Sequence, residues 1–255
     1  MDVKFKHVPD EVKRLKDSGI FDISYTHATS NIARFGINKT GKIMSPRVAI
    51  ANGIVPFSGE CLWGTYLFRA YHVSVSEYPE AIDGHNWHRY INYGMGVWTP
   101  EISEQSIFFF EEEKKRIVDQ PKCLADFYCP SRKKEIEIKI DGCIEIEKLR
   151  QERYKELSEK EKINIENPLP EVYVFDSNLR GLVSRRYLFG KPLSQVSHPF
   201  APAEINLKRY LTGIFTSLDV DETKAWISRV VRKEIPVGSL DALATWEEIN
   251  GIKNV

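Results

Sequence analysis

The stretch from Phe21 to Ile37 constrains the fold more than any other, because a strand pattern passes directly into a helix pattern within it. Its first residues alternate between apolar and polar types, with apolar side chains at Phe21, Ile23 and Tyr25. That alternation is typical of a half-buried strand. Ser30 or Asn31 can cap the short helix that follows, and Gly36 is expected to end it.

His27, Ala28 and Thr29 are expected at the junction between this strand and this helix. A strand-to-helix junction exposes polar side chains together with the unpaired N–H groups of the first helical turn. The junction is therefore a candidate ligand-binding point.

Composition indicates a folded protein with no strong overall charge. The chain has 255 residues, of which 42% are hydrophobic and 28% charged, enough for one large domain or one domain with a small appendage. Lys plus Arg equal Asp plus Glu at 36 each, so no overall field favours nucleic acid or an acidic membrane. The four cysteines lack CxxC spacing and no secretory apolar segment precedes them, which predicts a reduced, cytoplasmic setting. No apolar run approaches the roughly 20 residues that span a bilayer.

The other elements are predicted from local periodicity. Helices are expected over 10–19 and 147–162, and strands over 48–51 and 107–110. Residues 135–146 alternate strictly between charged and apolar types around Asp141-Gly142, which predicts a β-hairpin. Three helices are expected over 206–216, 221–233 and 241–250. The prediction is an α+β protein with a main domain over residues 1–197 and a small helical C-terminal part over 198–255.

Two later segments bear on the His27 junction. An aromatic strand that contains Gly64 and Tyr66 is expected over residues 62–69, and Tyr78 follows twelve residues after Tyr66. Glycine within a strand often marks close approach by a ligand or another backbone. A further strand, residues 171–175, opens with the carboxylate of Glu171.

The order of three motifs in this chain resembles that of the ADP-ribosyltransferases of the His-Tyr-Glu class. The motifs are a strand ending in His-Ala-Thr, a Gly-Thr-Tyr strand with a second tyrosine downstream, and a strand opening with Glu-Val-Tyr-Val-Phe-Asp. That class includes diphtheria toxin and the poly-ADP-ribose polymerases. The resemblance covers roughly residues 21 to 190. It implies a split, mostly antiparallel sheet that holds NAD in a cleft. The family has glycine where this chain has Ala28, which narrows the backbone freedom there.

The resemblance also implies roles for individual residues. His27 and Thr29 would hold the ribose of NAD, and the backbone of Ala28 would bind the nicotinamide amide. Tyr66 and Tyr78 would stack on the nicotinamide ring, with Gly64 beside Tyr66. Ser74 or Ser76 would lie near the amide. Glu171 would be the catalytic carboxylate, supported by His27 and Tyr66, because it can stabilise the positive charge that develops on the ribose.

The implied reaction is transfer of ADP-ribose from NAD to an acceptor with release of nicotinamide. Transfer of a single unit is favoured, since nothing indicates a polymer-binding region. The acceptor can be protein, DNA, RNA or a small molecule. A short transferase of this kind fits a bacterial or phage toxin, or an effector delivered into a host cell.

Three alternatives are left open by the residues. Arg69, Ser74-Val75-Ser76 and a Glu-x-Glu pair at 135–137 or 145–147 would fit the Arg-Ser-Glu class of ADP-ribosyltransferases. A transferase fold without activity could serve as a binding module, which the Gly-to-Ala change at Ala28 favours. His85 and His88 with Cys123 and Cys129 could bind zinc, but the wide cysteine spacing disfavours this, and no metal is expected.

Overall fold

A five-stranded sheet lies at the centre of the protein in the computed structural model, which describes residues 8–57, 73, 75–78, 97–119, 133–181, 187–188, 191–192 and 203–252. The strand order is β3 (Ser76–Glu77), β1 (Tyr25–Ser30), β4 (Pro170–Phe175), β8 (Leu211–Thr216) and β9 (Val237–Ser239). Neighbouring strands are antiparallel except for the β8–β9 pair. A mixed α+β architecture with a mostly antiparallel sheet is therefore confirmed.

Two further strand pairs stand apart from this sheet. β2 (Lys42–Met44) pairs with β7 (Glu204–Asn206), and β5 (Tyr187–Leu188) pairs with β6 (Lys191–Pro192), both antiparallel. Short helical segments link several strands: η1 (Asn31–Ala33) follows β1, and η4 (Ser177–Gly181) follows β4.

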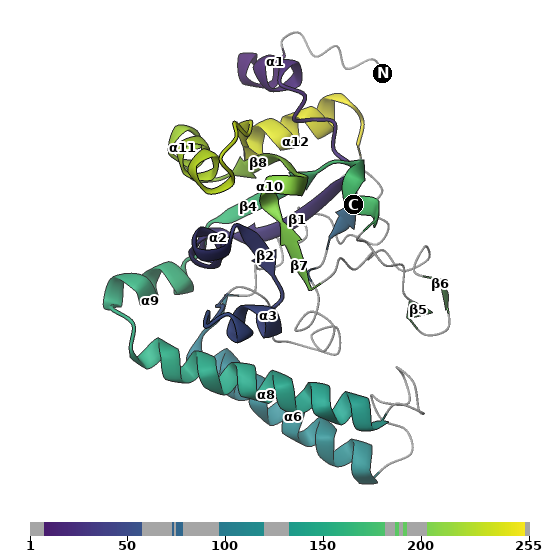
Figure 1. The fold of residues 1–255 in the computed structure, drawn as a ribbon, viewed down its shortest axis with the longest axis vertical. Coiled ribbons are helices and arrows are strands. Elements are labelled where there is room, and N and C mark those ends of the chain that lie inside the picture. The colour runs from purple at the N-terminus through teal and green to yellow at the C-terminus, as the bar shows by residue number, and fades with distance from the viewer. Residues whose placement is uncertain are drawn as a thin grey trace.

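Helices cover both faces of the central sheet. One face packs against α1 (Asp10–Asp17) and α12 (Leu240–Ile249), which lie together in Figure 1, around a core that contains Val12, Leu15, Val172, Val174, Phe215 and Leu243. The other face packs against α2 (Arg34–Thr40), α10 (Leu207–Tyr210) and α11 (Val220–Val231), around Ile37, Tyr173, Ile214, Trp226 and Ile227. Because β4 side chains alternate, Val172 and Val174 serve the first core and Tyr173 the second.

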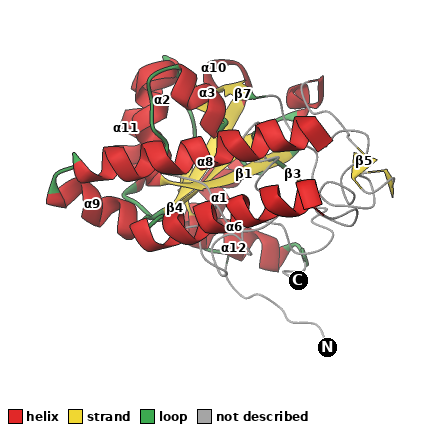
Figure 2. Cartoon of the chain, turned by 90° about the horizontal axis from the view of Figure 1, so that it is seen from below, coloured by secondary structure: helices red, strands yellow, loops and turns green. Residues whose placement is uncertain are grey.

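A second, mainly helical region surrounds a core of its own. The long helices α6 (Pro100–Asp119) and α8 (Lys133–Lys155) run side by side, as Figures 1 and 2 both show, and α3 (Pro46–Ala51) contacts α8. α9 (Glu159–Glu166) follows α8. The buried side chains of this core include Phe57, Trp98, Phe110, Ile140, Ile144 and Ile165. Every helix in the described ranges is too short or too polar to cross a membrane.

The predicted hairpin over 135–146 is wrong, since these residues lie within α8. Ile140, Cys143, Ile144 and Glu147 are buried at helical spacing, whereas Ile138 is 61% exposed. Charged and apolar residues alternate here by chance with the period of two that is typical of a strand. Packing against α6 outweighs the cost of about 1 kcal/mol for placing Gly142 inside a helix. Asp141, expected in the turn, instead forms an ion pair with Lys114 of α6.

The strands expected over 107–110 and 48–51 are also helical, in α6 and α3. Short apolar runs do not separate a strand from one face of a helix, and Phe110 is buried while Phe108 is exposed. The expected helix over 10–19 is confirmed as α1, and the helix after β1 continues beyond Gly36 to Thr40. The expected start of the preceding strand is wrong, because β1 begins at Tyr25 and Phe21 and Ile23 lie before it. His27, Ala28 and Thr29 therefore lie within β1 rather than at its junction with a helix. The helix predicted over 147–162 is divided between α8 and α9.

The C-terminal region is less helical than predicted. α11 and α12 confirm two of the three expected helices, but residues 211–216 form β8 rather than a helix. β8 pairs with β4 along its length, and β9 extends the same sheet. The region after residue 197 therefore contributes strands to the sheet that contains His27 and Glu171.

Gly213 of β8 allows the chain before β1 to pack closely on the sheet. A Cβ atom at this position would lie 2.4 Å from Cγ1 of the buried Ile20 side chain. We expect Gly213→Ala to lower the free energy of unfolding by about 1–3 kcal/mol, because overpacking forces side chains or backbone to shift. Urea denaturation measures this change.

Gly36→Ala provides the matched control. Its added Cβ would have no neighbour closer than 3.7 Å, and Gly36 lies inside α2, so alanine should raise stability by about 0.5–1 kcal/mol. Equal effects of the two substitutions would contradict the close contact between Gly213 and Ile20.

Candidate functional site

Glu171 lies near the start of β4, the central strand of the sheet, with strands on both sides. Its partner across the β1–β4 pair is Thr29, and its partner across the β4–β8 pair is Thr216. The Glu171 side chain is fully buried. A buried carboxylate is stable only when hydrogen bonds and an opposite charge compensate for the loss of water.

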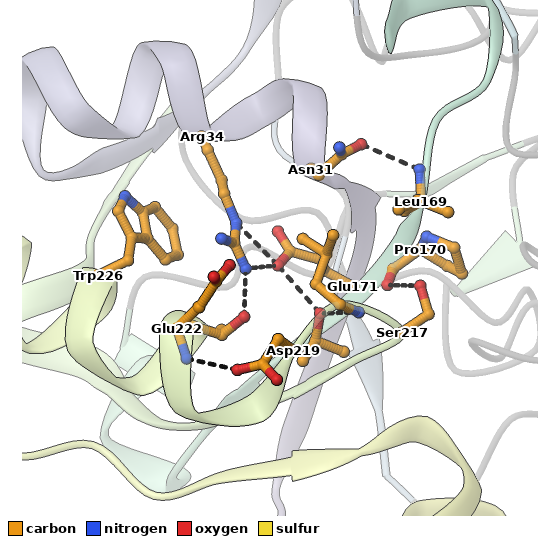
Figure 3. Close-up of polar contacts among 12 residues, drawn as sticks. Asn31, Arg34, Leu169, Pro170, Glu171, Ser217, Asp219, Glu222 and Trp226 are labelled. Atoms are coloured by element: carbon orange, nitrogen blue, oxygen red, sulfur yellow. Dashed lines mark hydrogen bonds and ion pairs between the residues drawn. The ribbon is translucent and has the colours of Figure 1, made fainter.

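Arg34 supplies that opposite charge from α2. Its Nε donates a 3.0 Å hydrogen bond to Oε1 of Glu171, and its Nη2 contacts the same oxygen. The Tyr173 hydroxyl donates to Oε2 at 3.1 Å, and Thr216 Oγ1 donates to Oε1 at 3.4 Å. Both carboxylate oxygens therefore have hydrogen-bond donors inside the protein, and Figure 3 shows the guanidinium beside the carboxylate.

α11 holds the Arg34 side chain over this carboxylate. Nη2 of Arg34 donates to Thr223 Oγ1 at 2.7 Å, and the guanidinium carbon lies 4.2 Å from the centre of the Trp226 ring. The indole N–H of Trp226 in turn donates to the side-chain oxygen of Asn38. Arg34 retains 18% side-chain exposure, against 0% for Glu171. The guanidinium thus covers the carboxylate.

Tyr173 stays neutral in this environment. Burial raises the pKa of its hydroxyl well above the usual value, and the neighbouring Glu171 carboxylate raises the pKa further. The hydroxyl therefore keeps its proton and remains a hydrogen-bond donor to Glu171.

Two of the predicted β1 site residues share the sheet face of Glu171. His27 pairs with Tyr173 and Thr29 with Glu171, and side chains two residues apart on a strand point to the same side. His27 is half-buried and Thr29 is buried. Ala28 belongs to the opposite face and packs against the core of Val172 and Phe215.

Tyr78 lies on the face opposite Glu171. Its backbone N–H donates to the carbonyl of Ser24, and its ring packs with Ala28 against the core beneath α1 and α12. Burial and the nearby Glu247 carboxylate raise the pKa of its hydroxyl, so it remains neutral. The structure thus brings His27, Thr29 and Glu171 together and separates Tyr78 from them.

Several predicted residues lie outside the described part of the chain. These are Gly64, Tyr66, Ser74, Arg69, His85, His88, Cys123 and Cys129. Ser76 lies in β3, opposite Thr26. Within the described ranges, no three His, Cys, Asp or Glu side chains are grouped as metal ligands.

The Glu-x-Glu alternative is not supported by the placement of its glutamates, because both pairs lie on α8 rather than on a strand. Glu145 forms an ion pair with Arg47 of α3. Glu147 is fully buried and accepts 2.7 and 3.0 Å hydrogen bonds from Arg150 and from the indole N–H of Trp98. These contacts join α8 to α3 and Glu147 to the buried side chains of Arg150 and Trp98.

Arg34, Thr223 and Trp226 were not identified from the sequence as site residues. Arg34 stands on the helix directly after the His-Ala-Thr strand, which is the one sequence signal that could have indicated it. Thr223 and Trp226 come from α11, inside the region predicted as a separate helical part. Only the packing of α11 on the sheet brings them to Glu171.

Comparisons with known proteins add no family. No protein-family model matches the sequence, and neither a curated protein nor a solved structure matches the chain.

Loss of the positive charge of Arg34 should destabilise the fold strongly. We expect Arg34→Met to lower the free energy of unfolding by about 3–5 kcal/mol, because the buried Glu171 carboxylate would lose its ionic partner. Thr223→Val, which removes one hydrogen-bond acceptor, should cost about 1 kcal/mol. Both changes are measured by urea denaturation at neutral pH.

The second buried pair supplies the comparison. Arg150 and Glu147 are both fully buried, and Arg150 Nε also donates to the carbonyl of Pro56 at 2.6 Å. Arg150→Met should therefore destabilise the protein by a similar amount. If Arg34→Met cost less than 1 kcal/mol while Arg150→Met cost several, the Glu171 carboxylate would not depend on Arg34.

Proposed function

We propose that this protein is a mono-ADP-ribosyltransferase, which transfers ADP-ribose from NAD to a macromolecular acceptor and releases nicotinamide. The observation that carries the proposal is the β1–β4 register, in which Thr29 lies directly opposite Glu171. His27 stands two residues before Thr29 and so shares this sheet face. A ribose-binding pair and a carboxylate on one face are what the chemistry needs.

The reaction requires stabilisation of positive charge. Cleavage of the bond between nicotinamide and ribose leaves the sugar electron-poor, as in glycoside hydrolysis. In the proposed reaction, Glu171 accepts a hydrogen bond from a ribose hydroxyl and stabilises this charge, while His27 and Thr29 orient the ribose. Tyr173 and Thr216 would keep the carboxylate fixed through their hydrogen bonds.

A second candidate is a binding module without transferase activity. The specific observation in its favour is that Glu171 is fully buried and bonded to Arg34, Tyr173 and Thr216. A carboxylate held in this way can serve the fold alone. The two candidates differ in whether nicotinamide is released.

The acceptor and the biological setting belong to the proposal as well. A bacterial or phage toxin, or an effector acting in the cytoplasm of a host cell, is the setting that the ADP-ribosyltransferase resemblance favours. Equal numbers of acidic and basic residues give no general preference for a nucleic-acid acceptor.

The decisive variant is Glu171→Gln, which keeps the size of the side chain and removes its charge. We expect nicotinamide release to fall at least about 100-fold, because the lost interaction acts on charge that develops in the transition state. NAD affinity, measured by calorimetry, should change by less than about threefold. His27→Ala should instead weaken NAD binding.

Two matched variants make the result specific. Glu147→Gln removes the charge of the other buried Glu–Arg pair and should leave nicotinamide release unchanged, so it controls for general destabilisation. Glu204 opens β7, is half-exposed and pairs with Lys42 at 2.7 Å, so Glu204→Gln tests a second carboxylate near the start of a described strand. Loss of release in Glu204→Gln alone would move the catalytic role to β7. NAD binding without release in the wild-type protein, with any acceptor offered, would favour the binding module.

A further inference from the structure

The cover over Glu171 poses a problem for the proposed reaction. A catalytic carboxylate must touch the substrate, yet Glu171 has no exposed surface and the guanidinium of Arg34 lies over it. The ribose can reach Oε1 only if Arg34 moves. The protein must then offer Arg34 another acceptor, since an arginine that leaves one carboxylate is stabilised by meeting a second one.

The first turn of α11 provides such an acceptor. Glu222 is adjacent to Thr223, whose Oγ1 already accepts from Nη2 of Arg34. Figure 3 shows the Glu222 side chain pointing from α11 toward the guanidinium. Glu222 is exposed, and no ion pair links it to another residue in the described ranges. Its backbone N–H is bound by the N-cap Asp219 at 2.8 Å, so the turn that carries it is fixed.

We propose that Arg34 is a two-position residue, which covers Glu171 in the free protein and moves to Glu222 when NAD binds. This inference rests on the proposed transferase function. In the second position, the Glu171 carboxylate is open to a ribose hydroxyl, and the guanidinium stays beside α11. Arg34 thereby couples substrate binding to exposure of the catalytic group.

The exchange takes the ionic partner from the buried Glu171 carboxylate, so NAD binding must supply the free energy that this costs. Three features of the site lower that cost. Glu171 keeps its hydrogen bonds from Tyr173 and Thr216 after Arg34 leaves, and the ribose hydroxyl replaces one lost donor. Arg34 moves to a more exposed site, which lowers its desolvation cost, and it can keep its contact with the Trp226 ring. Asp219 and Asp221 on the same turn add negative charge that favours the outer position.

The test follows the Arg34 side chain directly. The Nε–H signal of Arg34 in ¹⁵N-edited NMR, assigned by its loss in Arg34→Lys, reports the hydrogen bond to Glu171. NAD is titrated into the protein, and nicotinamide release is measured on the same sample. We expect the Arg34 Nε–H signal to shift and to exchange faster with water as NAD binds.

Glu222→Gln should reduce NAD affinity about two- to fivefold, since it removes the outer partner of an exposed pair. Asp221→Asn is the control, because it removes the same charge from the same turn but is not adjacent to Thr223 in the sequence, and it should change affinity less than Glu222→Gln.

The outcomes separate this inference from the proposed function. NAD binding and nicotinamide release with an unchanged Arg34 signal would overturn the two-position arginine and leave the transferase proposal intact. Equal effects of Glu222→Gln and Asp221→Asn would also overturn it, since a general charge effect would then suffice. Absence of both NAD binding and nicotinamide release would overturn the transferase proposal and the exchange together.

Discussion

The ion pair between Arg34 and Glu171 is the interaction on which the arrangement of the central sheet depends. A carboxylate without exposed surface must be compensated, and its donors come from α2, β4 and β8. Thr223 and Trp226 add α11 through their contacts with Arg34. Since a misplaced element would leave a buried charge unpaired, the pair fixes how these helices sit on the sheet as well as stabilising them.

The helical region also contains a buried ion pair between a glutamate and an arginine, but both residues of this pair lie on one helix. Glu147 and Arg150 are one helical turn apart on α8, so their pairing needs no distant partner. The pair also forms hydrogen bonds with two groups far away in the sequence, the indole N–H of Trp98 and the carbonyl of Pro56, and these bonds hold both residues against α8. The sheet and the helical region thus each contain a buried glutamate paired with an arginine, and in each the hydrogen bonds give direction that apolar packing alone lacks.

The elements predicted correctly from the sequence are those whose local pattern and burial agree. β4 was identified because its residues match a strand, and α1, α11 and α12 were identified as helices. A strand was also expected near β1, but it was placed too early, because Phe21 and Ile23 precede the strand that begins at Tyr25. The segment 135–146 misled because its alternation suits a strand, whereas the buried side chains at Ile140, Ile144 and Glu147 follow the helix that contacts α6. Tertiary contacts with α6, which the local sequence does not reveal, determine that this segment is a helix rather than a strand.

The candidate site also has features that the local sequence predicts and features that only tertiary contacts determine. A motif can place His27, Thr29 and Glu171 on strands, and the register then puts them on one face, because alternation is a local property. It cannot show that the carboxylate is covered, since the cover comes from the α2 helix and from α11, far along the chain. Nor can it show that Tyr78 packs on the opposite face with Ala28.

The position of Arg34 over Glu171 changes how the glutamate motif is interpreted. A glutamate at the start of a strand reads as an accessible catalytic group, yet the same residue here has all the hydrogen-bond partners of a structural ion pair. The two roles are compatible only if the pair can open, and opening requires that the covering arginine have somewhere else to bind. The chemistry of the site is therefore decided less by Glu171 itself than by the groups around Arg34 on α11, whose first turn carries carboxylates next to the threonine that already binds the guanidinium.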